Sequence, residues 1–231
     1  MSVLTVRGAT KDYMLGRAVV HALRGVDLDV QNGEFLCIIG PSGSGKTTLL
    51  NLAGCLDVPT MGSVRLFDHF DTNTLNDKAA TALRRDRIGF IFQSFNLMPV
   101  LNVFENIEFP LILQRVSRVE ARRRVNELID EVGLREFVEH RPEELSGGQR
   151  QRIAVGRALV TEPDLVLADE PTANLDRDSG MAVLDLMEEL NQKKGTTFIF
   201  STHDPKVMAR ASRTLHMVDG QLLEEANEQP Q

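Results

Sequence analysis

The chain has 231 residues, of which 42% are hydrophobic and 26% charged, so it is long enough for one large globular domain and too apolar to be disordered. Its formal net charge of -7 argues against a nucleic-acid partner, and no apolar run reaches the length of a transmembrane helix. The N-terminus lacks the regions of a signal peptide. The two cysteines, Cys37 and Cys55, lack metal-ligand spacing and are expected to be free thiols in a reducing compartment.

The chain is expected to begin with short strands over residues 3–8 and 21–39, and Asn32-Gly33, within the second range, is a strong hairpin signal. Tyr13, the only tyrosine in a chain without tryptophan, lies between these strands. Its ring is a candidate for stacking on a purine base, although a lone tyrosine in a small sheet is more often a packing residue.

A glycine-rich stretch follows the apolar run 35–39 and leads into a predicted helix. It consists of Gly40, Pro41, Ser42, Gly43, Ser44, Gly45, Lys46, Thr47 and Thr48. The order strand, glycine-rich loop, Gly-Lys-Thr and helix is the pattern of a phosphate-binding loop, whose backbone N–H groups form an anion cradle. Lys46 adds a cation for the β- and γ-phosphates, and the Thr47 hydroxyl is a ligand for Mg²⁺. The stretch therefore predicts that the chain binds a nucleoside triphosphate.

The next elements are a strand over 63–67, a helix over 77–86 and an apolar strand over 88–92 that ends in Gln93. Gln93 is either an edge residue or a movable ligand of Mg²⁺ and water, because ligands of open α/β sheets lie at the carboxyl ends of strands. From residue 94 to about 141 the pattern is helical. Ser117 and Glu120 are expected to form a capping box at the start of a helix, and Gly133 is expected to end that helix. Residues 94–113 mix loop-forming and apolar types, which suits either a cap on the core or a partner-binding surface.

The second half returns to alternating strands and helices. A buried strand over 165–168 ends in Asp169 and Glu170, which suits a carboxylate in the Mg²⁺ shell followed by a general base for water. A helix is expected over 178–193 and a strand over 197–201, followed by a helix capped by Asp204. Asp219-Gly220 predicts a hairpin, and the tail from about residue 226 is expected to fray.

The stretch Leu145-Ser146-Gly147-Gly148-Gln149 stands at the start of a predicted helix. Its serine and glycines leave unblocked N–H groups at the positive end of the helix dipole, where a second phosphate contact is favoured. Because residues 40–47 already supply one anion site, this second site suggests that the γ-phosphate is held from two sides.

Together these motifs resemble the ATP-binding cassette of ABC transporters, and the resemblance covers essentially the whole chain. It implies an α/β fold: a P-loop NTPase (RecA-like) core with an N-terminal antiparallel β-subdomain and an inserted α-helical subdomain. The chain is then a single ABC ATP-binding domain, with a core of about 1–93 and 158–225, a helical subdomain of about 94–157 and a tail of about 226–231.

The resemblance also implies a set of residue roles, with ATP and Mg²⁺ as cofactors. Tyr13 stacks on adenine, residues 40–48 bind the phosphates, and Thr47, Gln93 and Asp169 hold the metal. Glu170 is the catalytic residue, assisted by Gln93 and by the switch residue His203. A second copy of the chain, arranged head to tail, supplies Ser146, Gly147, Gly148, Gln149 and Asp176 to the same ATP.

Within the family, residues 55–62, 92–99 and 167–176 resemble a branch that contains lipoprotein-releasing, macrolide-efflux and cell-division cassettes. Asn174, in place of the commoner alanine, is usual for this branch. The branch implies export or membrane extraction through a separate transmembrane permease, contacted through residues of about 94–113, at the cytoplasmic face of the inner membrane.

Two alternatives differ from this function. A soluble ABC protein of DNA repair or translation would need a long coiled-coil insertion or a second cassette, and only about fifty residues separate Gln93 from residues 145–149. Signalling or mechanical coupling at the membrane, without transport, is not separated from export by the sequence.

Overall fold

In the computed structural model, residues 2–16, 18–202 and 208–224 are described. The strands are β1 (Ser2–Leu15), β2 (Ala18–Gln31), β3 (Phe35–Ile39), β4 (Met61–Leu66), β5 (Phe70–Asp71), β6 (Ile88–Phe92), β7 (Leu165–Asp169), β8 (Thr197–Thr202), β9 (Arg213–Val218) and β10 (Gln221–Glu224). The helices are α1 (Lys46–Ala53), α2 (Asp77–Arg87), α3 (Val103–Leu113), α4 (Arg118–Glu131), α5 (Gly147–Leu159) and α6 (Arg177–Lys194), with short 3-10 turns at Arg135–Phe137 and Pro142–Glu144.

The centre of the molecule is a six-stranded sheet in the order β10-β9-β3-β8-β7-β6, in which only the β10–β9 pair is antiparallel. Both faces of this sheet are covered. Alternate residues of β3 belong to two different clusters: Phe35 and Cys37 pack with α3 to α6, whereas Leu36 and Ile38 pack with α1 and the second sheet. Burial on both faces explains why these strands are continuous apolar runs without alternation.

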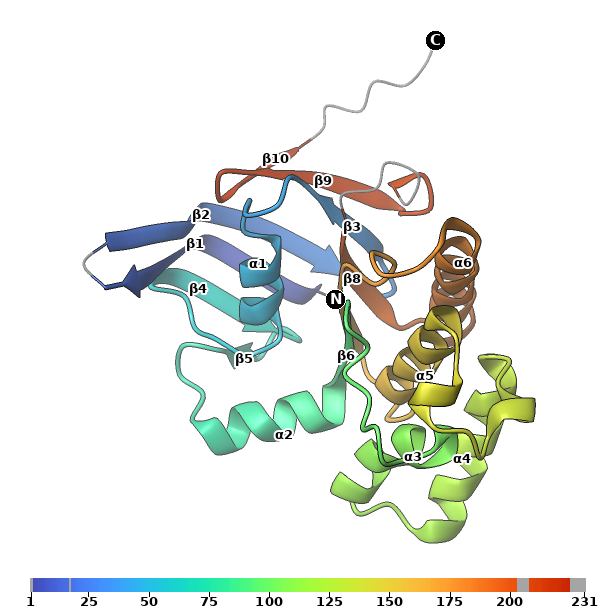
Figure 1. The fold of residues 1–231 in the computed structure, drawn as a ribbon. Coiled ribbons are helices and arrows are strands. Elements are labelled where there is room, and N and C mark those ends of the chain that lie inside the picture. Colours follow the sequence, from blue (N-terminus) through green and yellow to red (C-terminus); the bar gives the residue numbers. More distant parts are fainter. Residues whose placement is uncertain (1, 17, 203–207, 225–231) are drawn as a thin grey trace.

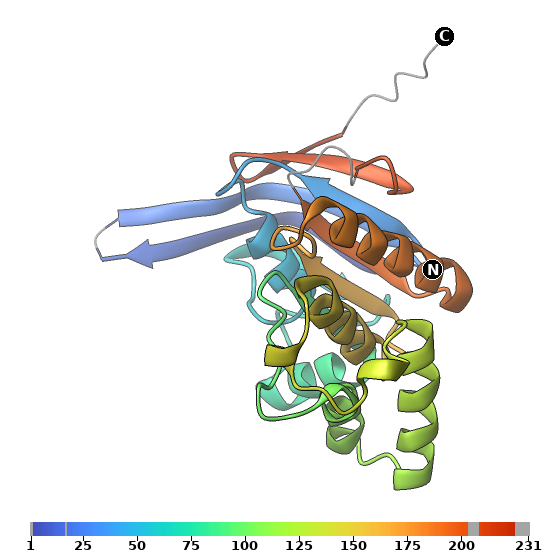
Figure 2. The same cartoon turned by 45° about the vertical axis from the view of Figure 1, so that its right-hand side comes forward.

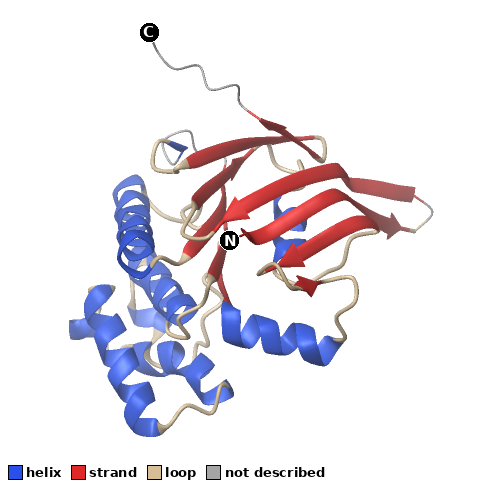
Figure 3. Cartoon of the chain, turned by 180° about the vertical axis from the view of Figure 1, so that it is seen from behind, coloured by secondary structure: helices blue, strands red, loops and turns tan. Residues whose placement is uncertain are grey.

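The second sheet is antiparallel, in the order β2-β1-β4-β5. Figure 1 and Figure 3 show that it lies on one side of the central sheet, whereas α3, α4, α5 and α6 gather on the other. The β1–β2 hairpin extends beyond the body of the molecule, most clearly in Figure 2. This arrangement confirms the predicted α/β fold with an antiparallel part near the N-terminus.

The N-terminal strands are longer than expected. β1 and β2 pair from Ser2 and Gln31 out to Leu15 and Ala18, so Tyr13 lies within a strand and pairs with Val20. Register shifts interrupt the ladder between Val6 and Ala9 and again near residues 9–12, and each bulge breaks the alternation that marks a strand in sequence.

The turn at Asn32-Gly33 was predicted as a hairpin, and this is wrong. Gly33 does adopt a positive φ of 77°, as such a turn requires, but β2 and β3 lie in different sheets. The Gly33 N–H donates instead to Thr197 Oγ1 at the start of β8, at 2.9 Å. Turn residues specify the local backbone, whereas the choice of pairing partner depends on the whole sheet.

The predicted capping box at the start of α4 is only half formed. Ser117 Oγ accepts from the Glu120 N–H at 3.4 Å, but the Glu120 carboxylate is bound by Arg123 and Arg124. Two guanidinium groups outcompete a single backbone N–H for the carboxylate. Gly133, with a φ of 68°, does follow the end of this helix. The predicted helix start at Asp204 lies outside the described residues.

Candidate functional site

The phosphate-binding loop joins β3 to α1 at the carboxyl end of the central sheet. Two of its glycines are required by their surroundings. A Cβ on Gly40 would lie 2.1 Å from the Met217 carbonyl oxygen, and one on Gly45 would lie 2.6 Å from that of Ala22. Gly45 also has a φ of 109° and is the N-cap of α1 without a side-chain cap. The first N–H groups of α1 therefore keep no side-chain acceptor, which suits an anion.

The Lys46 side chain is buried beside this loop. Its ammonium donates to the carbonyl oxygens of Gly40 at 2.7 Å and Pro41 at 3.1 Å, and it lies 3.8 Å from Glu170 Oε1. The Ser44 hydroxyl is buried and forms no hydrogen bond with any of the described residues. Because a buried hydroxyl without a partner is costly, this atom points to a polar ligand in the loop.

The carboxyl end of β7 brings the two predicted acidic residues to the loop. Asp169 Oδ2 accepts from the Thr47 hydroxyl at 2.9 Å. Glu170 follows with a left-handed backbone, at a φ of 47°, which is uncommon for a non-glycine residue and is typical of strained functional positions. The Glu170 carboxylate also affects Cys37 on β3: burial and this negative charge raise the pKa of the Cys37 thiol to about 12.

Ser201 supports both acidic residues and was not predicted from the sequence. It lies on β8 in register with Asp169, its hydroxyl donates to Asp169 Oδ1 at 2.6 Å, and it accepts from the Glu170 N–H at 3.0 Å. Ser201 is fully buried. The signal that would have identified it is a hydroxyl residue at the end of a buried parallel strand, next to the strand that ends in two carboxylates.

A cavity of about 370 Å³ lies at the carboxyl ends of β3 and β7. Its lining residues are Val20, His21, Ala22, Ser42, Gly43, Gly45, Lys46, Thr47, Thr48, Gln93, Asp169, Glu170 and Ala173. The structure thus places most of the phosphate-binding loop, Gln93 and both acidic residues around one space. His203 lies outside the described residues.

Tyr13 lies near this cavity but is not among its lining residues. Its hydroxyl donates to Asp57 Oδ2 at 3.0 Å, and the Lys11 ammonium lies 5.1 Å from the centre of its ring. Burial and the bond to Asp57 raise the pKa of Tyr13. Stacking of this ring on adenine remains a prediction.

The residues assigned to a second copy lie together and are not among the residues that line the cavity. Ser146 is the N-cap of α5, and it forms a complete capping box with Gln149. The prediction of unblocked N–H groups here is therefore wrong for Gln149. Asp176 is the N-cap of α6, and bonds from the side chain and backbone of Ser179 lower its pKa. A Cβ on Gly148 would lie 3.1 Å from Ser179 Cβ, so the two helix starts touch.

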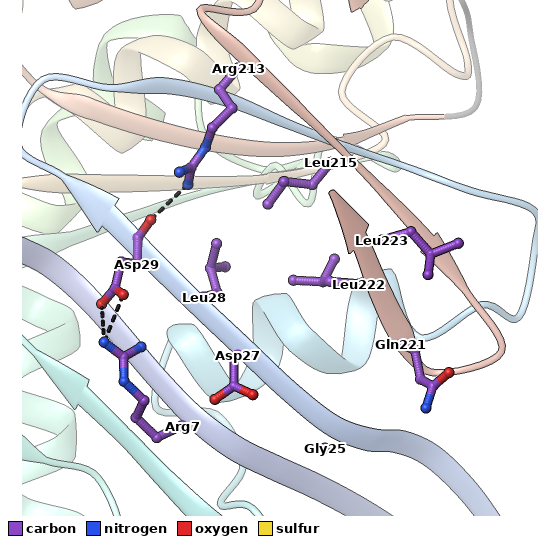
Figure 4. Close-up of a pocket in the computed structure, with 10 residues that line it drawn as sticks. All are labelled: Arg7, Gly25, Asp27, Leu28, Asp29, Arg213, Leu215, Gln221, Leu222 and Leu223. Atoms are coloured by element: carbon purple, nitrogen blue, oxygen red, sulfur yellow. Dashed lines mark hydrogen bonds and ion pairs between the residues drawn. The ribbon is translucent and has the colours of Figure 1, made fainter. Parts of the chain in front are cut away.

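A larger cavity, of about 590 Å³, lies between β2 and the β9–β10 hairpin (Figure 4). Two of its charged side chains are held by neighbouring groups: Arg7 donates to both carboxylate oxygens of Asp29, and Arg213 donates to the Asp29 carbonyl oxygen at 2.7 Å. It contains no residue of the phosphate-binding loop and no paired acidic residues at a strand end. The smaller cavity is therefore the candidate site.

The donor set of the smaller cavity fits Mg²⁺. No group of three His, Cys, Asp or Glu side chains suited to a metal occurs among the described residues. Mg²⁺ does not need one, because it is commonly held by one or two carboxylates together with substrate phosphates and water. The paired oxygens of Thr47 and Asp169, with Gln93 on the same cavity wall, provide such a partial shell.

This cavity and sheet define a P-loop nucleotide-binding site in an ATP-binding cassette fold. The family model described as ABC transporter matches residues 23–173. The dimeric structure of a post-hydrolysis state of the ATP-binding cassette MJ0796 bound to ADP and Pi, a Methanocaldococcus jannaschii protein, superimposes with a TM-score of 0.87 at 43% identity, over 95% of this chain and 96% of that one.

Two curated relatives belong to the predicted branch. The lipoprotein-releasing system ATP-binding protein LolD of Bordetella avium is 44% identical, over 96% of each chain. The macrolide export ATP-binding/permease protein MacB of Rhodopseudomonas palustris (strain BisB18) is 45% identical over 95% of this chain and 33% of its own length. The chain therefore belongs to the ABC transporter family, and it is an ATPase of the ATP-binding cassette class.

Proposed function

We propose that the chain is the ATP-hydrolysing subunit that powers export or membrane extraction through a separate transmembrane permease. The observation that carries this proposal is the convergence of Lys46, Thr47, Asp169 and Glu170 on one cavity at the carboxyl ends of β3 and β7. A phosphate cradle beside a metal-binding oxygen pair and a carboxylate is the arrangement that phosphoryl transfer to water requires.

Each residue has a role that follows from its position. The N–H groups of the loop and the Lys46 ammonium bind the β- and γ-phosphates, and Thr47 and Asp169, with Gln93, hold Mg²⁺. Mg²⁺ bound there would neutralise charge on the phosphates during transfer. Glu170 accepts a proton from the attacking water, and Ser201 holds the Asp169 carboxylate and the backbone N–H of Glu170. His203 is proposed as the residue that contacts the γ-phosphate.

A second copy of the chain completes the site in this proposal. Ser146, Gly147, Gly148, Gln149 and Asp176 lie outside the cavity of their own chain, and they are proposed to contact ATP held by the other copy. The MJ0796 cassette, 43% identical, is described as dimeric. ATP between two such copies holds them together, and hydrolysis releases them.

The membrane partner is proposed to dock beside residues 94–113. A groove of about 430 Å³ borders this segment, and its lining includes Leu56, Phe92, Leu113 and the α2 residue Arg84. Leu56 and Leu113 are both about half exposed, at 49% and 53%. No helix among the described residues is long and apolar enough to cross a bilayer. The chain is proposed to associate with the cytoplasmic face of the inner membrane through this groove.

The direction of transport is inferred from the branch. LolD is described as part of a lipoprotein-releasing system and MacB as a macrolide exporter. One description names release and the other export, so export or extraction is proposed for this chain.

The proposal predicts that Glu170→Gln binds ATP, forms a stable dimer and no longer turns over. The amide keeps the shape of the side chain but accepts no proton from water, so the ATP-bound dimer persists. Size-exclusion chromatography with ATP measures the dimer, and phosphate release measures turnover. Glu127→Gln, an exposed α4 carboxylate paired with Arg123, is the control and should resemble the unaltered chain. Near-normal hydrolysis by Glu170→Gln would show that another residue is the base.

A further inference from the structure

Asn174 lies in the segment between β7 and α6, and its side chain holds Gln93 at two points. Its Nδ2 donates to the Gln93 carbonyl oxygen at 3.0 Å, and Gln93 Nε2 donates to Asn174 Oδ1 at 3.4 Å. These bonds join positions 81 residues apart in the chain. One asparagine therefore fixes both the backbone and the side chain of a residue that lines the nucleotide cavity.

The loop that follows Gln93 has a conformation that needs such support. Phe95 and Asn96 both have positive φ, at 64° and 48°, a region that is uncommon for residues other than glycine. Arg157 of α5 donates to their two carbonyl oxygens at 2.8 and 2.5 Å, and burial lowers the pKa of this guanidinium. Arg157 thus holds the backbone at Phe95 and Asn96, while Asn174 holds Gln93 at the start of the loop.

The segment that carries Asn174 also touches the start of α5. A Cβ on Gly147 would lie 3.1 Å from Leu175 Cδ2 and 3.7 Å from the Asn174 carbonyl oxygen. Two positions further on, Asp176 caps α6. Residues 174–176 therefore lie between Gln93, on the cavity of this chain, and Gly147, in the motif assigned to the other copy's ATP.

We propose that Asn174 is a positioning residue that makes the placement of Gln93 depend on the segment 173–176, and so couples a chain's own nucleotide cavity to its contact with the second copy. This inference rests on the proposed function. When the second copy displaces or orders residues 173–176, the two bonds carry that change to Gln93. Without these two bonds, a change in residues 173–176 no longer moves Gln93 or the start of the loop that follows it.

The test compares Asn174→Ala with the unaltered chain, with Gln93→Ala and with the double variant. Alanine removes the side-chain atoms that make both bonds and leaves the backbone unchanged. Asn126→Ala is the matched control, because the Asn126 side chain also donates one bond, to the Arg122 carbonyl oxygen, and accepts one, from Arg135, but lies on α4 away from the cavity. Thermal unfolding should shift by a similar small amount in both asparagine variants.

Two readouts are expected to separate coupling from a merely structural role. Without nucleotide, backbone amide exchange over residues 92–98 should become faster in Asn174→Ala and stay unchanged in Asn126→Ala. With ATP, kcat should fall on the order of fivefold with little change in KM, and this loss should vanish in the Gln93→Ala background. If Gln93→Ala leaves no measurable rate, the inference is tested by amide exchange over residues 92–98 and by whether Asn174→Ala lowers kcat without changing KM.

Several results would overturn the inference. These are unchanged exchange over 92–98, a rate equal to that of the Asn126→Ala control, or the same fold-loss in the presence and absence of the Gln93 side chain. A failure of the proposed function is distinct, because the unaltered chain would then not hydrolyse ATP.

Discussion

Ser201 shows how much of the site depends on single atoms that no motif contains. Its hydroxyl bridges Asp169 and the backbone of Glu170, and it is fully buried between them. Asp169 in turn accepts from Thr47, so a chain of bonds runs from β8 through β7 to the phosphate-binding loop. Each member of this chain orients the next, which is how a catalytic carboxylate is kept in one direction.

At this scale we predict that Ser201→Ala slows ATP hydrolysis by roughly 10- to 150-fold, because a hydrogen bond to a charged group contributes roughly 1.5–3 kcal/mol. Ser212→Ala is the control. Ser212 also accepts one bond and donates one, both with the Phe35 backbone, but it contacts no acidic residue of the site. Steady-state rates and urea unfolding of both variants should show similar stability losses and a rate loss in Ser201→Ala alone. Equal rates in the two variants would remove Ser201 from the site.

At the scale of elements, the close contact between β6 and α5 positions Gln93. Gly89 of β6 lies against Ala158 of α5, and a Cβ there would meet the Ala158 carbonyl oxygen at 2.4 Å. Since a backbone oxygen cannot move aside without moving the helix, the strand that ends in Gln93 is fixed against the helix that begins at Gly147. The starts of α3 and α5 are each held by a complete capping box.

This contact predicts different outcomes for two glycines, one of which faces α5 and one of which lies within it. Gly89→Ala should destabilise the protein by about 1–3 kcal/mol through overpacking. Gly156→Ala should be nearly neutral, because its Cβ would meet only side-chain atoms, Ile107 Cδ1 at 3.0 Å, Ile107 Cγ1 at 3.4 Å and Val132 Cγ1 at 3.7 Å, and alanine favours a helix by roughly 0.8–1.0 kcal/mol over glycine. Urea denaturation midpoints compare the two. A smaller loss in Gly89→Ala than in Gly156→Ala would contradict the close strand–helix contact.

At the scale of the whole molecule, the nucleotide cavity and the starts of α5 and α6 are separate surfaces of one chain. The cavity is lined from β2, the phosphate-binding loop, α1 and the ends of β6 and β7, whereas Ser146 and Asp176 are used locally as helix caps. We propose that these two surfaces are the two halves of one site, which a second copy completes by head-to-tail association.

The head-to-tail arrangement predicts that two inactive variants restore each other. Lys46→Ala removes the phosphate cation. Ser146→Asp keeps a good N-cap on α5 but places a negative charge where a phosphate is expected. In a mixed dimer, one site has both defects and the other has none. Mixing equal amounts should therefore restore roughly a quarter of the normal rate, because half of the dimers are mixed and each has one intact site. A mixture as inactive as its parts would argue against this arrangement.

Local patterns in the sequence determined the fold class, the family and the ATPase class, and the comparisons confirm all three. The glycine-rich loop of residues 40–45 and the strand ending in Asp169 can be identified from the sequence, because their backbone geometry and chemistry depend on a few consecutive residues. The roles of Gln93 and Ser146 were inferred from their places at a strand end and a helix start, those of His203 and Asp176 from the family resemblance, and all four stay predictions.

The tertiary structure alone decided which distant groups meet. The pairing of β3 with β8 and β9, the bridge from Ser201 to Asp169, and the bonds between Asn174 and Gln93 all join residues far apart in sequence. Such contacts are set by strand order and by packing across the sheet, and no local pattern encodes them. The phosphate-binding loop follows from nine consecutive residues, whereas the site around it follows from the sheet.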